Sequence, residues 1–132
     1  MADQTTTQGK KVLLVEDDLF LSNILGTRLA KAGLNVVKAM NGEEAVKAVE
    51  SGRPDLILLD IIIPKRSGFE VLEEIKSDPS FRSVPVIIVS NLGQETDVER
   101  GKKLGVVEYF VKAQTSIDDI VDSVKRHLGS AA

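Results

Sequence analysis

Five polar residues stand at the ends of four mostly apolar runs, and their types suit phosphoryl chemistry. Glu16 and Asp17 follow "VLLV", Asp60 follows "LILL", Ser90 follows "VIIV", and Lys112 follows "EYFV". A carboxylate can act as a nucleophile and form an acyl phosphate. A lysine and a hydroxyl can stabilise the charge on phosphate oxygens. If these side chains converge, the sequence predicts transfer of a phosphoryl group onto an aspartate.

Asp60 is the most informative of these residues, because apolar residues flank it on both sides in "DLILLDIIIPK". A buried carboxylate is costly unless it is paired, metal-bound or neutralised. Glu16, Asp17 and Asp60 cannot all stay ionised in one place without a cation. Oxygen ligands favour hard cations, and Mg²⁺ is the usual choice beside phosphate. We therefore expect Mg²⁺ to bind where these three carboxylates meet.

The aliphatic runs alternate with helical patterns, which places the polar residues at one edge of a sheet. The predicted strands are residues 12–15, 34–39, 55–60, 86–89 and 106–111. Such alternation indicates an α/β fold, a parallel sheet with helices on both faces. Ligands of open α/β sheets bind outside the carboxyl ends of the strands, where the strand order reverses. In the order 2-1-3-4-5, residues 12–15 and 55–60 are neighbours at that point.

Capping residues predict where several helices begin. Asn41 with Glu44, and Ser67 with Glu70, have the spacing of a capping box. Thr115 is the predicted cap of the last helix.

Length and composition narrow the class of protein. The chain has 132 residues, no cysteine and a net charge of −3. These values exclude disulfides and thiolate metal sites, and they argue against nucleic-acid binding. No apolar run is long enough to cross a membrane, and the N-terminus lacks the apolar core of a signal peptide. We expect a cytoplasmic protein with one domain over residues 10–129 and tails at 1–9 and 130–132.

Four motifs together resemble the receiver domain of two-component response regulators. They are "VLLVEDD", "LILLDIIIPKRSG", "VIIVSN" and "EYFVK", and the resemblance extends from about Lys11 to Leu128. It implies a flavodoxin-like three-layer (βα)₅ sandwich with strand order 2-1-3-4-5. It also implies a signalling phospho-switch, of the chemotaxis-type single-domain form, that catalyses its own aspartyl phosphorylation and dephosphorylation rather than a metabolic reaction.

The resemblance assigns the acidic residues. Asp60 matches the phosphorylated aspartate, and Glu16 and Asp17 match the acidic pair. Asp17 and Asp60 are the expected direct Mg²⁺ ligands, together with the backbone carbonyl of Ile62. Asp18 is the competing candidate for the acidic pair.

The resemblance also assigns the residues that respond to phosphorylation. Ser90 matches the switch hydroxyl, Tyr109 the switch aromatic residue, and Lys112 the lysine that contacts phosphate. Phosphorylation is then expected to move Ser90 and to repack Tyr109 inward.

The implied partners are proteins. A sensor histidine kinase or a histidine phosphotransfer protein would donate the phosphoryl group. The face formed by residues 94–104, 106–111 and 115–128 would then contact a downstream protein target. The resemblance implies a monomer or a weak phosphorylation-dependent dimer, with no nucleic-acid or membrane partner.

The sequence departs from the family pattern at three positions. Lys112 precedes Ala113 where the family usually has a proline after a bond that is often cis, so the geometry of this bond stays open. Asn91 replaces the typical alanine after the switch hydroxyl. Ile62 is apolar where many relatives are polar, which bears on how water reaches the phosphoaspartate.

Other functions fit the residues less well. A flavodoxin would need donors for a flavin phosphate in a crevice that is acidic here. A haloacid-dehalogenase-type phosphatase expects a second aspartate at position 62, which is isoleucine, and no P-loop motif occurs.

His127, the only histidine, is most simply a solvated residue. A receiver-like interaction module that is not phosphorylated stays open as the alternative.

Overall fold

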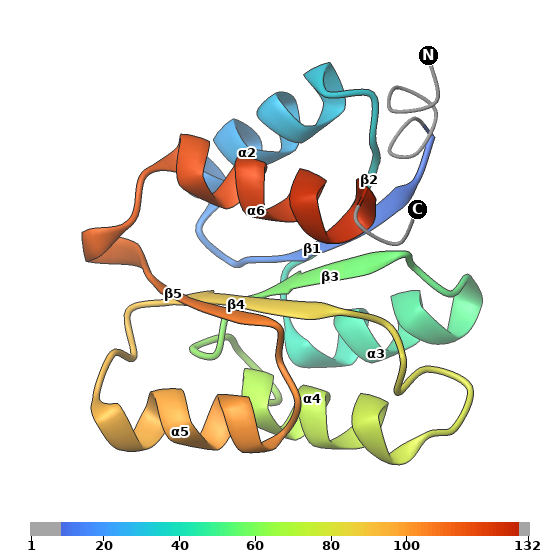
Figure 1. The fold of residues 1–132 in the computed structure, drawn as a ribbon. Coiled ribbons are helices and arrows are strands. Elements are labelled where there is room, and N and C mark those ends of the chain that lie inside the picture. Colours follow the sequence, from blue (N-terminus) through green and yellow to red (C-terminus); the bar gives the residue numbers. More distant parts are fainter. Residues whose placement is uncertain (1–8, 130–132) are drawn as a thin grey trace.

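The computed structural model describes residues 9–129, which form a parallel five-stranded sheet between two layers of helices (Figure 1). The strands are β1 (Lys11–Val15), β2 (Asn35–Ala39), β3 (Leu56–Leu59), β4 (Val86–Ser90) and β5 (Glu108–Val111). The helices are α2 (Leu19–Lys31), α3 (Gly42–Ser51), α4 (Gly68–Ser77), α5 (Glu95–Lys103), the 3₁₀ turn η1 (Lys112–Gln114) and α6 (Ile117–Gly129).

The strand order is β2-β1-β3-β4-β5, which confirms the predicted flavodoxin-like α/β sandwich. Residues 1–8 and 130–132 of the predicted tails lie outside the described residues. Gly9 is described, and its N–H donates to the Gly33 carbonyl at 2.8 Å. Within residues 9–129, no helix has both the length and the apolar character needed to cross a membrane.

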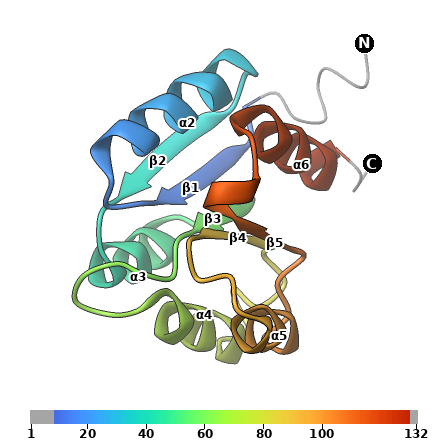
Figure 2. The same cartoon turned by 90° about the vertical axis from the view of Figure 1, so that its left-hand side faces the viewer.

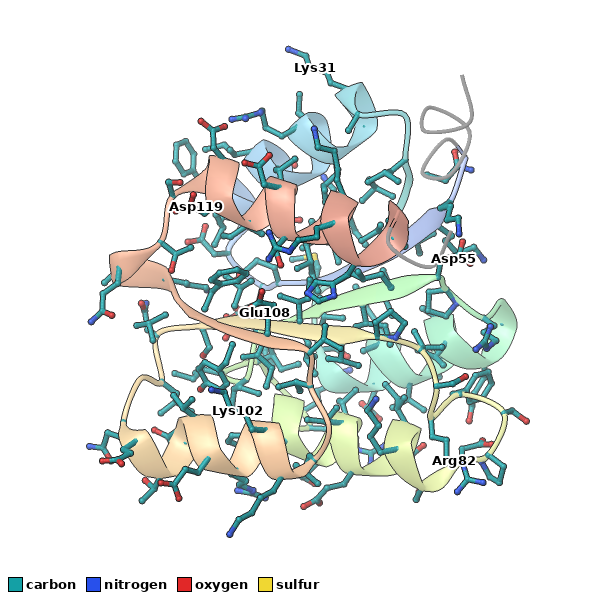
Figure 3. The ribbon with its side chains drawn as sticks, in the orientation of Figure 1. Lys31, Asp55, Arg82, Lys102, Glu108 and Asp119 are labelled. Atoms are coloured by element: carbon teal, nitrogen blue, oxygen red, sulfur yellow. The ribbon has the colours of Figure 1, made fainter. Side chains whose placement is uncertain are left out.

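Alternate residues of the central strands fill two separate cores, because successive side chains of a strand point to opposite faces. Leu13, Ile57 and Ile88 pack with α3 and α4 on one face. On the other face, strand residues such as Leu14 and Leu58 pack with α2 and α6. Side chains fill the space between the sheet and each helix layer (Figure 3). The central strands β1, β3 and β4 are thus buried on both faces, and their ends are left for polar chemistry.

Side-chain caps fix where the helices begin near those strand ends. Ser67 and Glu70 form the predicted capping box of α4. Asn41 accepts from the Glu44 N–H at 2.9 Å, as predicted, but the Glu44 carboxylate accepts from Met40 rather than from Asn41. The bond from the Glu44 carboxylate back to the backbone therefore reaches Met40, one residue before the N-cap Asn41.

The start of α6 differs from the prediction. Ser116, not Thr115, caps the helix, since its hydroxyl accepts from the Asp119 N–H at 3.1 Å. The Thr115 hydroxyl instead donates to the Val111 carbonyl at 2.8 Å, across the η1 turn that the sequence did not predict. No cis peptide bond occurs between residues 9 and 129, so the Lys112–Ala113 bond is trans.

Gly68, the first residue of α4, packs against the backbone that follows β3. Its N–H donates to the Ile61 carbonyl at 2.9 Å. A Cβ atom at Gly68 would lie 2.7 Å from the Ile61 Cα and would overlap the Asp60 carbonyl oxygen. The absence of a side chain here therefore sets the path of the chain around Asp60.

We predict that Gly68→Ala lowers the free energy of unfolding by about 1–3 kcal/mol, because rigid backbone must move to admit the methyl group. Gly26→Ala is the matched control, since a Cβ there meets only the flexible end of Lys38. That change should raise stability by up to about 1 kcal/mol through helix propensity. Urea unfolding of both variants measures the two effects, and equal effects of the same sign would contradict the prediction.

Candidate functional site

The loops that follow β1, β3, β4 and β5 meet on one side of the molecule, which faces the viewer in Figure 2. Carboxylate oxygens of Glu16, Asp17 and Asp60 lie within 4.8 Å of one another there. Glu16 and Asp60 are 2% and 4% exposed, whereas Asp17 is exposed. The structure thus brings together the three acids that the sequence nominated, with one of them open to solvent.

Lys112 joins the two buried acids. Its Nζ lies 2.7 Å from Asp60 Oδ2 and 2.9 Å from Glu16 Oε1. The Lys112 side chain is 18% exposed, so little water screens these ion pairs. Removing one partner of such a buried pair leaves an uncompensated charge, which is strongly destabilising.

The pKa values of this cluster reflect the same contacts. Burial disfavours the Lys112 ammonium, but its hydrogen bonds to Asp60 and Glu16 outweigh that effect, so the pKa of Lys112 is raised. Burial raises the pKa of the Glu16 carboxyl, and the hydrogen bond from Lys112 opposes the rise. Lys112 therefore keeps its positive charge between the two acids throughout the physiological pH range.

Backbone amides orient the acidic side chains. The Ile62 N–H donates to Asp60 Oδ1 at 3.1 Å, and the Asp18 N–H donates to Glu16 Oε2 at 3.1 Å. The Asp18 carboxylate caps α2 by accepting from the Phe20 N–H at 3.0 Å. The Asp18 carboxylate is thus already used as the N-cap of α2, which favours Glu16 and Asp17 as the acidic pair.

The charges and donor atoms of the cluster fit a divalent cation. Three carboxyl groups and one ammonium give the cluster a formal charge of −2. Carboxylate oxygens are the ligands that Mg²⁺ prefers, and Mg²⁺ usually keeps several waters. Asp17, the exposed member, is accessible to a hydrated ion.

Ser90 and Tyr109 are connected through the backbone of one residue. The fully buried Ser90 hydroxyl accepts from the Leu92 N–H at 3.3 Å. The Tyr109 hydroxyl donates to the Leu92 carbonyl, and its half-buried ring packs inward against the core shared with α3 and α4. The sequence did not predict the role of Leu92, because backbone hydrogen bonds leave no mark on residue type.

Exposed apolar side chains lie beside the acids in the chain. Leu19 and Phe20 open α2 directly after the acidic run and are 60% and 74% exposed, and Ile62 is 56% exposed. Helical spacing could have indicated Leu19 and Phe20, because Leu25 and Leu29 define the buried side of α2. Exposed apolar residues next to polar ones are typical of protein contact surfaces.

Comparison with known proteins points to one family. The family model of the response regulator receiver domain matches residues 12–125. The polar-differentiation response regulator DivK of Brucella anthropi is 33% identical over 122 residues, covering 92% of this chain and 98% of DivK. A probable transcriptional regulator, ycf27 of Guillardia theta, is 37% identical over 93% of this chain, but the match covers only 48% of that protein. The chain thus spans about half the length of some curated relatives.

Solved structures agree with that family. The phosphorylated cyanobacterial phytochrome response regulator RcpA superposes with a TM-score of 0.82 at 34% identity, covering 94% of this chain and 96% of RcpA. The Mn²⁺-bound form of the response regulator Rcp1 superposes with a TM-score of 0.78 at 29% identity, covering 89% and 92% of the two chains.

Tyr109 offers a direct test of the site's packing, since it is the only tyrosine and the chain has no tryptophan. Burial, followed by the charges of Asp97 and Asp60, raises the pKa of Tyr109 from 10.0 to about 12. The folded state favours the neutral phenol, so this contribution to stability is present below pH 10 and is lost as pH rises toward 12. We predict a phenolate absorbance midpoint near pH 12 in the folded protein and near 10 in urea. Coincident midpoints, with circular dichroism confirming the fold, would contradict the inward packing.

Proposed function

Since this chain belongs to the response regulator receiver domain family, we propose that it is a phospho-switch that accepts a phosphoryl group on Asp60 from a phosphohistidine. The observation that carries this proposal is the contact of one lysine, Lys112, with both Asp60 and Glu16 at the carboxyl edge of the sheet. The family supports a signalling role, and this geometry supports Asp60 as the acceptor.

The proposed reaction forms an acyl phosphate. An oxygen of the Asp60 carboxylate bonds to phosphorus while the phosphorus–nitrogen bond to the partner's histidine breaks. The imidazole nitrogen keeps the electron pair and takes up a proton from water. Lys112, already 2.7 Å from Asp60, stabilises the negative charge on the transferring group, and the Ile62 N–H holds the acceptor carboxylate in place.

We assign the cation site to Glu16, Asp17 and Asp60, with the backbone carbonyl of Ile62 as a further ligand. The oxygen-only donors and the charge of −2 favour Mg²⁺. Bound Mg²⁺ would neutralise charge on the phosphoryl oxygens. Mn²⁺ in the similar protein Rcp1 supports a divalent cation here.

We propose that Ser90 and Lys112 contact the new phosphoryl group. Within residues 9–129 the Ser90 hydroxyl accepts from the Leu92 N–H and donates to no other group, so its hydrogen is left for donation. A shift of Ser90 would move both backbone groups of Leu92 and so change the hydrogen bond to Tyr109. This is a population shift driven by new charge-assisted bonds, read out on the face of α5, β5 and α6.

The proposed partners are proteins on both sides of the switch. A sensor histidine kinase or histidine phosphotransfer protein would approach across the apolar side chains of Leu19, Phe20 and Ile62. A downstream protein would bind the α5–β5–α6 face. We propose a monomer or a weak phosphorylation-dependent dimer acting in the cytoplasm, and Ile62 and Asn91 as the residues that limit water at the phosphoaspartate.

We predict that wild-type protein gains one phosphoryl group from acetyl phosphate with Mg²⁺, and that Asp60→Asn gains none, as measured by intact mass. Asp55→Asn is the matched control, because Asp55 precedes the same strand and lies where the strands begin (Figure 3). Its carboxylate accepts from the Lys11 N–H, a bond that asparagine can keep.

Each outcome of this labelling experiment decides between functions. Labelling of Asp60→Asn at the wild-type level would remove Asp60 as the acceptor. Wild-type protein that is folded, binds Mg²⁺ and is not labelled would favour the alternative, a receiver-like interaction module.

A second prediction distinguishes Asp17 from the adjacent Asp18 as a ligand of Mg²⁺. Asp17→Asn should weaken Mg²⁺ binding at least about tenfold, because a carboxylate ligand is lost. Asp18→Asn removes the same charge one residue away but retains a good N-cap, so it should change the affinity little. Saturating Mg²⁺ at about 100 Kd should stabilise the wild-type protein by about 2.7 kcal/mol. Calorimetric titration and thermal unfolding measure both effects, and an equal loss in the two variants would contradict the assignment of Asp17.

A further inference from the structure

The inward ring of Tyr109 lies next to α5, at the position of Gly101. Gly101 is the one residue of α5 that is buried. A Cβ atom at Gly101 would lie 3.0 Å from Tyr109 Cδ2 and 3.0 Å from Ile88 Cδ1, which is tighter than an ordinary contact. Gly101 has no positive φ, so its backbone does not require glycine. What favours glycine here is the space that the Tyr109 ring occupies together with the end of the Ile88 side chain.

Arg100, the neighbour of Gly101, attaches α5 to α4. Its guanidinium carbon lies 4.3 Å from the centre of the Phe69 ring, which is a cation–π distance. Its Nη2 also lies 3.4 Å from Glu73 Oε2. Phe69 is itself 5% exposed in the core, so it provides a fixed surface for the arginine.

Within its own residues, Glu95–Lys103, helix α5 has little else to hold it against the sheet. Its sequence "ETDVERGKK" is mostly charged, and its N-terminus has no side-chain cap. A helix with one buried residue gains little from apolar burial. Leu104, which follows the last turn of α5, packs against the core. Within the helix itself, the position of α5 beside the Tyr109 ring depends on the contacts of Arg100 and Gly101.

We propose that Gly101 and Arg100 are positioning residues that hold Tyr109 inward, Gly101 by leaving room for the ring and Arg100 by fastening α5 to Phe69. The name "switch" for Tyr109 rests on the proposed function, but its inward position does not. Changing either residue shifts the ring toward solvent and loosens its bond to the Leu92 carbonyl.

The first test is Gly101→Ala, read by the fluorescence of the single tyrosine. We expect the acrylamide quenching constant of Tyr109 to rise about twofold, because the ring would then be exposed to the quencher in a large share of the molecules. The phenolate midpoint should move from about 12 toward 10. Gly26→Ala, the same change in α2, should leave both values as in the wild type. Wild-type quenching in Gly101→Ala would overturn the role of Gly101.

The second test is Arg100→Ala, with Arg28→Ala as its control. Arg28 is also a surface arginine in an ion pair, with Asp118, but it joins α2 to α6. Only Arg100→Ala should increase quenching of Tyr109. Equal quenching in the two variants would overturn the role of Arg100.

A double variant shows whether Gly101 acts through the tyrosine ring. With Tyr109 present, Gly101→Ala should lower the thermal midpoint, because the methyl group meets the ring. In a Tyr109→Ala background the same change should raise it, since alanine favours the helix and fills the space left by the ring. Lowering of the same size in both backgrounds would overturn the proposal. None of these measurements uses a phosphoryl donor, so they can fail or succeed independently of phosphorylation at Asp60.

Discussion

The ion pairs that Lys112 makes with Asp60 and Glu16 require the ends of three strands to meet. Lys112 follows β5, Asp60 follows β3 and Glu16 follows β1. Burying two carboxylates is tolerable only because the ammonium is held within 2.9 Å of each. Strand order, the register of β5 and the η1 turn must therefore all agree for the site to exist.

The alternation of strands and helices follows from patterns of residue type, whereas the strand order came from the resemblance to the receiver family. With that order, the placement of the acids directly after strands predicts that they meet. Continuous aliphatic runs identify buried parallel strands, and polar residues placed directly after them lie at one edge. The predicted capping residue of α6 was wrong for a local reason. Thr115 and Ser116 can both cap a helix, and the Thr115 hydroxyl is used by the Val111 carbonyl across η1. Composition does not distinguish these two arrangements.

Other features depend on distances that a sequence does not contain. The bond between the Tyr109 hydroxyl and the Leu92 carbonyl involves the backbone of a residue whose side chain is irrelevant to it. The preference for glycine at position 101 arises from the Tyr109 ring, eight residues further along the chain, and from the Ile88 side chain of β4, both across helix–strand contacts. The trans bond at Lys112–Ala113, by contrast, is the ordinary state of a peptide bond that precedes a residue other than proline.

The three isoleucines after Asp60 show how one apolar run serves three purposes. Ile61 is 3% exposed and anchors the loop in the core, while Ile63 packs partly against the same core. Ile62 between them turns its side chain to solvent and its N–H to the Asp60 carboxylate. Lys65 then adopts a φ of 71°, an unfavourable value for a residue with a side chain, so that the chain can turn into α4. The loop is thus fixed on both sides of Ile62. A rigid loop suits the role proposed for Asp60, because positioning supplies most of the catalysis of phosphoryl transfer.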